Sequence, residues 1–219
     1  TGATGNGLEE HGVAVQIAAH LARYLRVRGH AVSIIDYPSL SNAADLNATV
    51  RAINAGSYNL SVSLHCDSSD NPDACGAHVC HHRTYHKDGT FTDSVQGKAL
   101  ASAIAGPLCK LLPGRADPVQ ARPEQEEKAS GLQVLRATRP PAVLCECSFI
   151  TNVADAEMMK NRPELIAQAI GAGILNYIDN GIDHINSVLF LSLAGIVYFI
   201  AKMILAIKQI RQLGQGDAI

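Results

Sequence analysis

Short apolar segments alternate with longer segments of helical spacing along most of the chain. Helical spacing is found at residues 9–29, 42–55, 94–112 and 163–178. Strand-like apolar segments lie at residues 31–37, 60–65, 76–82, 134–136 and 142–147. Alternating strands and helices bury their apolar faces best as a sheet covered by helices. The sequence therefore predicts an α/β fold with a mostly parallel twisted sheet flanked by helices. The polar, charged segment at residues 115–130 is expected to form a surface loop.

Two strand-like segments end on side chains that carry chemistry. Residues 60–65 alternate, so Leu60, Val62 and Leu64 share one face and His65 lies on the other. Glu146 lies in the apolar segment at residues 142–147, with cysteines on both sides of it. A carboxylate there is unfavourable unless it is paired, bound to a metal or open to a cleft. Sites in open α/β sheets collect at the carboxyl ends of strands, so both residues are candidates.

The composition excludes some functions and leaves others open. A net charge of −2 and a pI near 6.5 argue against a protein that binds nucleic acid. The six cysteines form no CxxC pair, so a structural zinc ribbon is not expected. Cys66 and Cys75 are candidates for a disulfide, but free thiols are favoured because a domain of this size needs no such bridge.

The composition changes after Gly181. Residues 188–201 carry no charge, and with residues 203–207 they span about 20 residues, or about 30 Å as a helix, which matches a bilayer core. Residues 182–219 are therefore predicted to be a transmembrane or membrane-associated helix with a basic tail, its C-terminus in the cytoplasm. A surface amphipathic helix and a membrane-disrupting, holin-like helix are the alternatives.

Three segments together resemble a known family. They are Gly2–Glu10, which opens the first helix, Ser63–Asp67, which ends a strand, and residues 141–152, where a strand runs into a helix cap. In this order and spacing they resemble the zinc-dependent N-acetylmuramoyl-L-alanine amidases of the amidase 3 type. The likeness extends from about Thr1 to Asn180, so residues 1–181 are expected to be the catalytic domain.

The resemblance implies a function and a site. The substrate would be peptidoglycan, cut between N-acetylmuramic acid and L-alanine, at the cell envelope or outside the cell. Glu10 and His65 would be Zn²⁺ ligands, and Glu146 would be the general base that takes a proton from water. The family's first ligand is a His in a Gly-rich turn after a first strand. Both would lie ahead of Thr1, so we expect this sequence to be N-terminally incomplete.

Several alternatives stay open at this point. Glu9 competes with Glu10 for the ligand position, and His11 is a weaker substitute for the missing His because it points about 100° away from Glu10. Four histidines are expected at the surface or at the edge of a cleft: His78, His81, His82 and His86. Three arginines are candidates for contacts to an anionic stem peptide or are simply solvated: Arg115, Arg122 and Arg136. A non-catalytic, membrane-anchored remnant that binds peptidoglycan and another zinc peptidase on a similar fold are the competing functions.

Overall fold

The computed structural model describes residues 2–125 and 132–181. The chain divides into a unit at Thr1–Tyr177 and a second at Ile178–Ile219, of which only residues 178–181 are described. The predicted hydrophobic helix at residues 182–219 lies outside the described residues. Within the described ranges, no helix has the length and the apolar character needed to cross a lipid bilayer.

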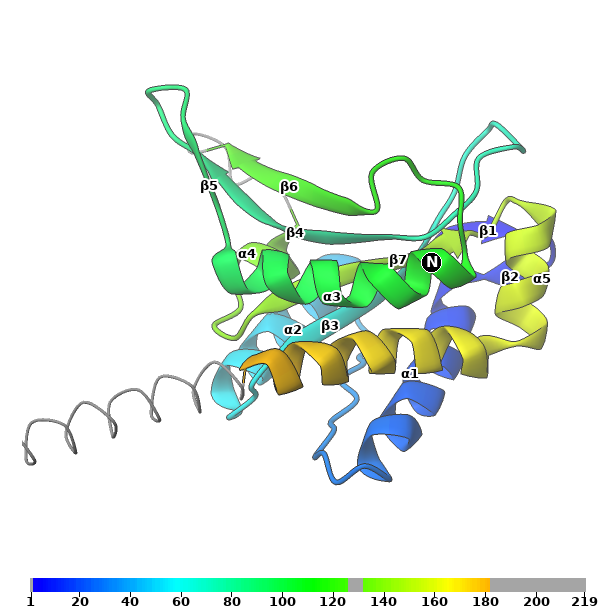
Figure 1. The fold of residues 1–219 in the computed structure, drawn as a ribbon, viewed down its shortest axis with the longest axis horizontal. Helices are drawn as coiled ribbons and strands as arrows, with labels where there is room; N and C mark the ends of the chain where they lie inside the picture. Colours follow the sequence, from blue (N-terminus) through cyan, green and yellow to red (C-terminus); the bar gives the residue numbers. More distant parts are fainter. Residues whose placement is uncertain (1, 126–131, 182–219) are drawn as a thin grey trace, which may run out of the picture. The chain divides into compact units, whose positions relative to one another are not determined.

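A mixed five-stranded sheet lies at the centre of the first unit (Figure 1). Its strands are β3 (Ser61–Asp67), β4 (His78–Tyr85), β5 (Phe91–Asp93), β6 (Val119–Gln125) and β7 (Ala142–Phe149). β7 pairs in parallel with β3 and antiparallel with β4, and β4 pairs in parallel with β6 and antiparallel with β5. The prediction of a mostly parallel sheet was therefore wrong in this respect. No helix connects β3 to β4, so no crossover brings β4 back parallel to β3.

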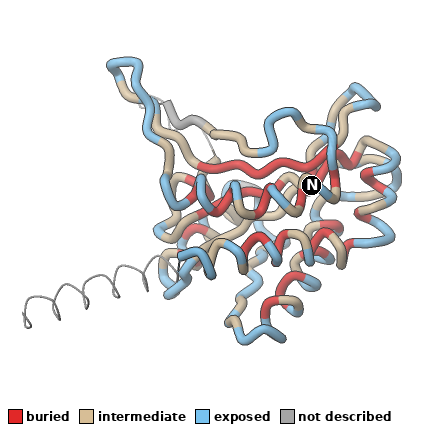
Figure 2. The backbone as a smooth tube through the Cα atoms, in the orientation of Figure 1, coloured by how far each residue is buried: buried red, intermediate tan, exposed pale blue. Residues whose placement is uncertain are grey.

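Three helices pack together on one face of this sheet. They are α1 (Glu10–Arg26), α3 (Val95–Leu111) and an unlabelled helical segment at residues 163–177. α1 contacts β3, and α3 contacts β4 and β7. Glycines allow the third helix to approach the others closely. A Cβ on Gly173 would lie 2.4 Å from the Ile104 Cα in α3, and one on Gly171 would lie 2.4 Å from the Tyr24 ring in α1. Figure 2 shows that many of the buried residues lie in these helices and in β4 and β7.

A second apolar cluster covers part of the opposite face. It joins α2 (Asn42–Ala55) and α4 (Gln133–Arg136) to β4 and β7. Its buried members are Ile53, Cys80, Val134, Leu135, Ala142 and Leu144. Side chains alternate along a strand, so Glu146 follows Leu144 on this same face. The uncovered end of the face, one row beyond Leu144, is where the candidate site lies.

A short hairpin and a capped helix complete the unit beside this site. β1 (Thr4–Gly5) and β2 (Leu8–Glu9) flank a turn in which Asn6 and Gly7 have φ of 49° and 74°. Positive φ at both positions is the hairpin turn that Asn-Gly favours. The Asn6 Nδ2 atom donates to the Ile150 carbonyl at 3.0 Å, which docks the hairpin against the end of β7. α5 (Val153–Asn161) is capped by Asn152, whose side chain accepts two backbone N–H groups, and this confirms the predicted cap.

Three predicted segments differ from the structure. Residues 31–37 form no strand. Side chains of α1 contact this segment, since Arg26 donates to the Val32 carbonyl and His11 contacts Asp36. Residues 134–136 belong to α4 and not to a strand. Val134 and its neighbour Leu135 are both buried in this helical turn, which lies beside α2 in the second apolar cluster. The predicted loop at residues 115–130 contains β6, an edge strand in which a proline is tolerated.

Candidate functional site

Glu10 and His65 meet at the carboxyl end of β3. The Glu10 Oε1 atom lies 2.7 Å from the His65 Nδ1 atom, and the His65 Nε2 atom lies 3.1 Å from the Ser63 hydroxyl. The His65 side chain is 42% exposed, whereas Glu10 is only 15% exposed. The pair is therefore reachable from solvent on its histidine side.

The backbone of the hairpin and of β3 fixes the Glu10 carboxylate. Its Oε2 accepts from the Ala3 N–H at 2.7 Å, and its Oε1 accepts from the Cys66 N–H at 3.3 Å. Burial raises the pKa of Glu10, but the hydrogen bonds from His65, Ala3 and Cys66 outweigh burial and hold the pKa below its usual value. Burial lowers the pKa of His65, but the hydrogen bond to Glu10 and the charges of Glu146 and Glu10 raise it above its usual value. Glu10 is thus an ionised acceptor aimed at His65.

Glu146 lies beside this pair in a row that crosses three strands. His65 of β3 is in register with Glu146 of β7, which is in register with His78 of β4. We call His65, Glu146 and His78 the cross-strand row. Glu146 is the one residue of β7 that is not fully buried, and its Oε2 atom has no hydrogen-bond partner among the described residues. Burial, followed by the charge of Asp67, raises the pKa of Glu146 to about 7.

A β-bulge follows Glu146 directly. His65 pairs with Glu146 and Asp67 pairs with Phe149, so β7 carries one more residue than β3 over this interval. Within the bulge, Ser148 is buried and has φ of 114°, a conformation that non-glycine residues rarely adopt. Bulges next to active sites re-aim the side chains around them. Here the bulge sets the register between β7 and β3 for the residues that follow Glu146.

Asp155 of α5 holds the bulge in place. Its Oδ2 atom accepts hydrogen bonds from the Ser148 hydroxyl, the Phe149 N–H at 3.2 Å and the Gly76 N–H at 3.0 Å. Asp155 is buried, so these contacts are shielded from water. One carboxylate therefore ties the end of β7 to the segment that leads into β4.

Asp67, His78 and two arginines form the other side of the site. The Arg115 guanidinium lies 3.4 Å from the Asp67 Oδ2 atom, and the Arg122 guanidinium lies 3.4 Å from the His78 Nε2 atom. His78 is 0% exposed. Burial, aided by the charges of both arginines, lowers its pKa to about 3. His78 is therefore neutral, and it accepts from Arg122 while its Nδ1 atom faces Asp67 at 3.5 Å.

The structure brings together some of the predicted residues and separates others. Glu10, His65 and Glu146 converge, whereas Glu9 lies exposed in β2 and His11 contacts Asp36 at 3.1 Å.

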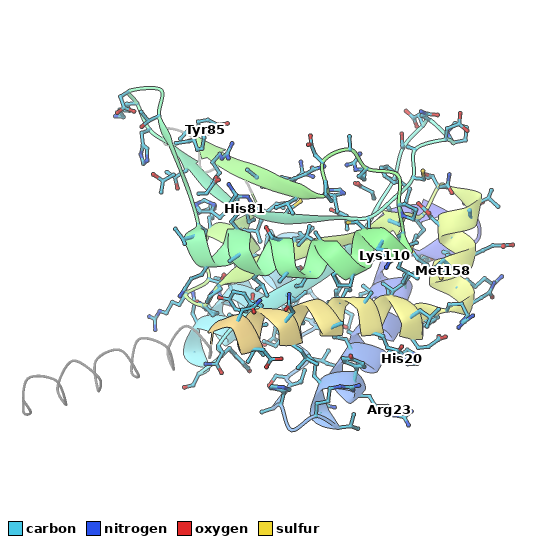
Figure 3. All side chains as sticks on the ribbon, viewed as in Figure 1. His20, Arg23, His81, Tyr85, Lys110 and Met158 are labelled. Carbon is cyan, nitrogen blue, oxygen red and sulfur yellow. The ribbon has the colours of Figure 1, made fainter. Side chains whose placement is uncertain are left out.

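Among the histidines, the prediction of surface or cleft-edge positions was wrong for His78 and His81, which are buried. Figure 3 labels His81 on β4 near α3. The position of His78 next to Glu146 could not be predicted from the sequence, because it depends on the antiparallel pairing of β4 with β7.

The donor atoms of Glu10 and His65 are of the types that bind a zinc ion. Carboxylate oxygen and imidazole nitrogen are ordinary zinc ligands, but the two atoms are hydrogen-bonded across 2.7 Å. Two ligands of one tetrahedral zinc lie roughly 3.3 Å apart, so this pair would have to separate to share the ion. The buried, unpartnered Oε2 of Glu146 lies alongside them. The described ranges contain no group of three or more His, Cys, Asp or Glu side chains in a metal-binding arrangement. The described residues therefore fit two ligands of such an ion.

Comparison with known proteins gives a consistent result. The sequence model of the N-acetylmuramoyl-L-alanine amidase family matches residues 1–176. The N-acetylmuramoyl-L-alanine amidase LytC of Bacillus subtilis is 28% identical over 183 residues, which are 81% of this chain and 33% of LytC. This chain thus spans about a third of the length of that relative.

Solved structures agree with the sequence comparison. The catalytic domain of CD27L endolysin, described as targeting Clostridia Difficile, is 26% identical with a TM-score of 0.62, and the match covers 80% of this chain and 88% of that domain. The apo form of the amidase Ami1 from Mycobacterium abscessus has a TM-score of 0.67 at 18% identity, covers 81% of this chain and 82% of Ami1, and supports the fold alone.

Proposed function

The chain belongs to the N-acetylmuramoyl-L-alanine amidase family, and from this premise we propose that it hydrolyses the amide bond between N-acetylmuramic acid and L-alanine in peptidoglycan. The observation that carries the proposal is the convergence of Glu10, His65 and Glu146 at one end of the sheet. It agrees with the name of the relative LytC, an N-acetylmuramoyl-L-alanine amidase. Peptidoglycan as substrate would place the protein at the cell envelope.

Glu10 and His65 are the residues that would hold Zn²⁺. Glu10 is kept ionised and oriented by two backbone N–H groups, so it would be an anionic ligand once its hydrogen bond with His65 opens. His65 would present its Nδ1 atom once the proton shared with Glu10 is displaced. When bound, zinc supplies Lewis acidity that activates water and polarises a carbonyl group.

Glu146 is the proposed general base and acid. Its pKa near 7 suits a group that must both accept and return a proton at neutral pH. Ionised Glu146 would take a proton from the attacking water as the oxygen bonds to the lactyl carbonyl carbon. It would then donate that proton to the alanine nitrogen as the C–N bond breaks. The products are a lactyl carboxylate and a free L-alanine amino group.

The charge around Glu146 supports both steps. Asp67 and Glu10 raise its pKa, and His65 and Arg122 lower it, so the carboxyl can exist in either protonation state near neutrality. Its unpartnered Oε2 atom needs no bond broken before it can accept a proton. The bulge held by Asp155 keeps this carboxylate in the row beside His65.

The variant Glu146→Gln separates catalysis from metal binding. Equilibrium dialysis should show unchanged zinc binding, because Glu146 is not one of the two proposed ligands. Hydrolysis of purified peptidoglycan should fall by at least about a hundredfold, since loss of general acid–base catalysis has about that effect. Retained turnover would remove Glu146 from the mechanism. Loss of zinc binding would show instead that Glu146 is a ligand.

A further inference from the structure

Two arginines adjoin the proposed catalytic residues without taking part in the proposed chemistry. Arg115 follows α3 in the chain and lies 3.4 Å from Asp67, two residues after His65. Arg122 lies on β6 and contacts His78, the residue that stands next to Glu146 in the cross-strand row. Asp67 therefore separates Arg115 from the cross-strand row, and Arg122 contacts the row at His78. Asp67 and His78 lie 3.5 Å apart, so both arginines lie at the His78 end of the row.

Two cationic side chains lie close to the Asp67 carboxylate. Among the side chains that the structure describes, Asp67 is the carboxylate within ion-pair distance of Arg115, and Arg122 has none at that distance. His78 is neutral and contributes no charge. Arg122 also acts on the charges of Asp67 and Glu146, so binding of an anion here depends on the unused N–H donors and not on a surplus of charge. The Arg115 and Asp67 side chains are 31% and 24% exposed, so a solute can reach them.

The neighbours of Arg115 and Arg122 fix their direction and leave donors unused. The Arg115 guanidinium lies 5.1 Å from the Phe149 ring centroid, and its buried Nε atom has no hydrogen-bond partner among the described residues. Arg122 spends one N–H on the buried His78 ring. A guanidinium carries five donors in a planar fork that matches a carboxylate, so each arginine can bind an anion without losing its present contacts.

We propose that Arg115 and Arg122 form a subsite for a carboxylate of the stem peptide, on the residue that follows L-alanine. This inference rests on the proposed amidase function and deepens it. A substrate with its scissile amide at Glu146 must place the next peptide residue to one side of the cross-strand row. The side of His78 and Asp67 is the one that carries free cationic donors. His78 acts here as a positioning residue that orients Arg122.

Binding of two soluble ligands to the non-hydrolysing Glu146→Gln protein tests the subsite. Both are N-acetylmuramoyl dipeptides with L-alanine first, and their second residue carries either a free α-carboxylate or the corresponding carboxamide. Isothermal titration at pH 7 should show about tenfold tighter binding of the carboxylate, as expected for one partly exposed charge-assisted hydrogen-bond pair. The preference should shrink as salt is raised.

Three variants in that background identify the residues responsible. Arg122→Gln should bring the ratio of the two dissociation constants close to one while leaving the affinity for the carboxamide unchanged. Arg122→Lys should restore part of the preference, because it restores charge without the planar fork. Arg51→Gln is the matched control, since it deletes an exposed arginine on α2, which carries no site residue. It should leave the ratio unchanged.

Other outcomes overturn the inference. Equal affinities of the starting protein for the two ligands would mean that no carboxylate subsite exists. A ratio that persists in the Arg115→Gln, Arg122→Gln double variant would place the recognition elsewhere. Absence of binding by either ligand would also contradict it. The proposed amidase function is judged separately, by the products formed from whole peptidoglycan.

Discussion

Asp155→Ala should destabilise the protein and disturb the position of Glu146. The substitution removes the acceptor of three hydrogen bonds, from the Ser148 hydroxyl and from the Gly76 and Phe149 N–H groups. A buried donor left without a partner costs about 1–3 kcal/mol, and neighbouring losses are not additive, so we expect a total of about 3–5 kcal/mol. That is a large part of an ordinary stability of about 5–15 kcal/mol.

Urea unfolding followed by circular dichroism measures this loss. Glu157→Ala in the same helix is the matched control, because Glu157 is exposed and should change the free energy of unfolding by no more than about 0.5 kcal/mol. Peptidoglycan hydrolysis by Asp155→Ala should also fall at temperatures where the variant remains folded, since the bulge behind Glu146 loosens. A loss in stability below about 1 kcal/mol would refute the reasoning that one carboxylate holds this bulge.

Further predictions concern helix packing, titration and the proposed metal ligands. Gly173→Ala should lower the free energy of unfolding by about 1–2 kcal/mol, because the added Cβ would lie 2.4 Å from a backbone atom of α3. Gly12→Ala is the control: an added Cβ there meets open space, so this variant should not be destabilised. Urea titration of the two variants measures the difference. Burial raises the pKa of Glu146 in the folded chain to about 7, so the folded state binds the Glu146 proton more tightly than the unfolded state does. The stability that this proton adds to the fold is present at low pH and is lost as the pH rises through about 7. The metal-free protein should therefore lose about 1–3 kcal/mol between pH 5 and pH 8 relative to Glu146→Gln, and an identical pH dependence of the two proteins would contradict the raised pKa. His65→Ala should weaken zinc binding in equilibrium dialysis by at least about tenfold, and unchanged affinity would exclude His65 as a ligand.

The periodicity of the sequence was sufficient for most of the fold. Apolar spacing located the long helices and the strands β3, β4 and β7 to within a few residues. The signal was strong in β4 and β7 because they are largely buried, and in β3 it came from the alternation of Val62 and Leu64 with polar residues. It failed at residues 134–136, where three residues are too few to separate a strand from a helical turn. It also failed at β6, whose polar edge-strand sequence contains Pro123 and resembles a loop.

Only those site residues that belong to recognisable sequence motifs could be predicted. Glu10, His65 and Glu146 stood out through family resemblance and strand ends, and the structure brings them together. His78 could not be found in the same way, because its place beside Glu146 depends on the antiparallel register of β4 and β7. The role of Asp155 was hidden for a similar reason, since its partners are separated from it in the chain.

The proposed amidase activity is tested most directly by digesting purified peptidoglycan with this protein in the presence of zinc and counting new L-alanine amino termini. We predict their release, its loss on adding a chelator, its return when zinc is restored, and no new reducing sugar ends. Release of amino termini other than L-alanine, or release that a chelator does not affect, would contradict a zinc-dependent N-acetylmuramoyl-L-alanine amidase.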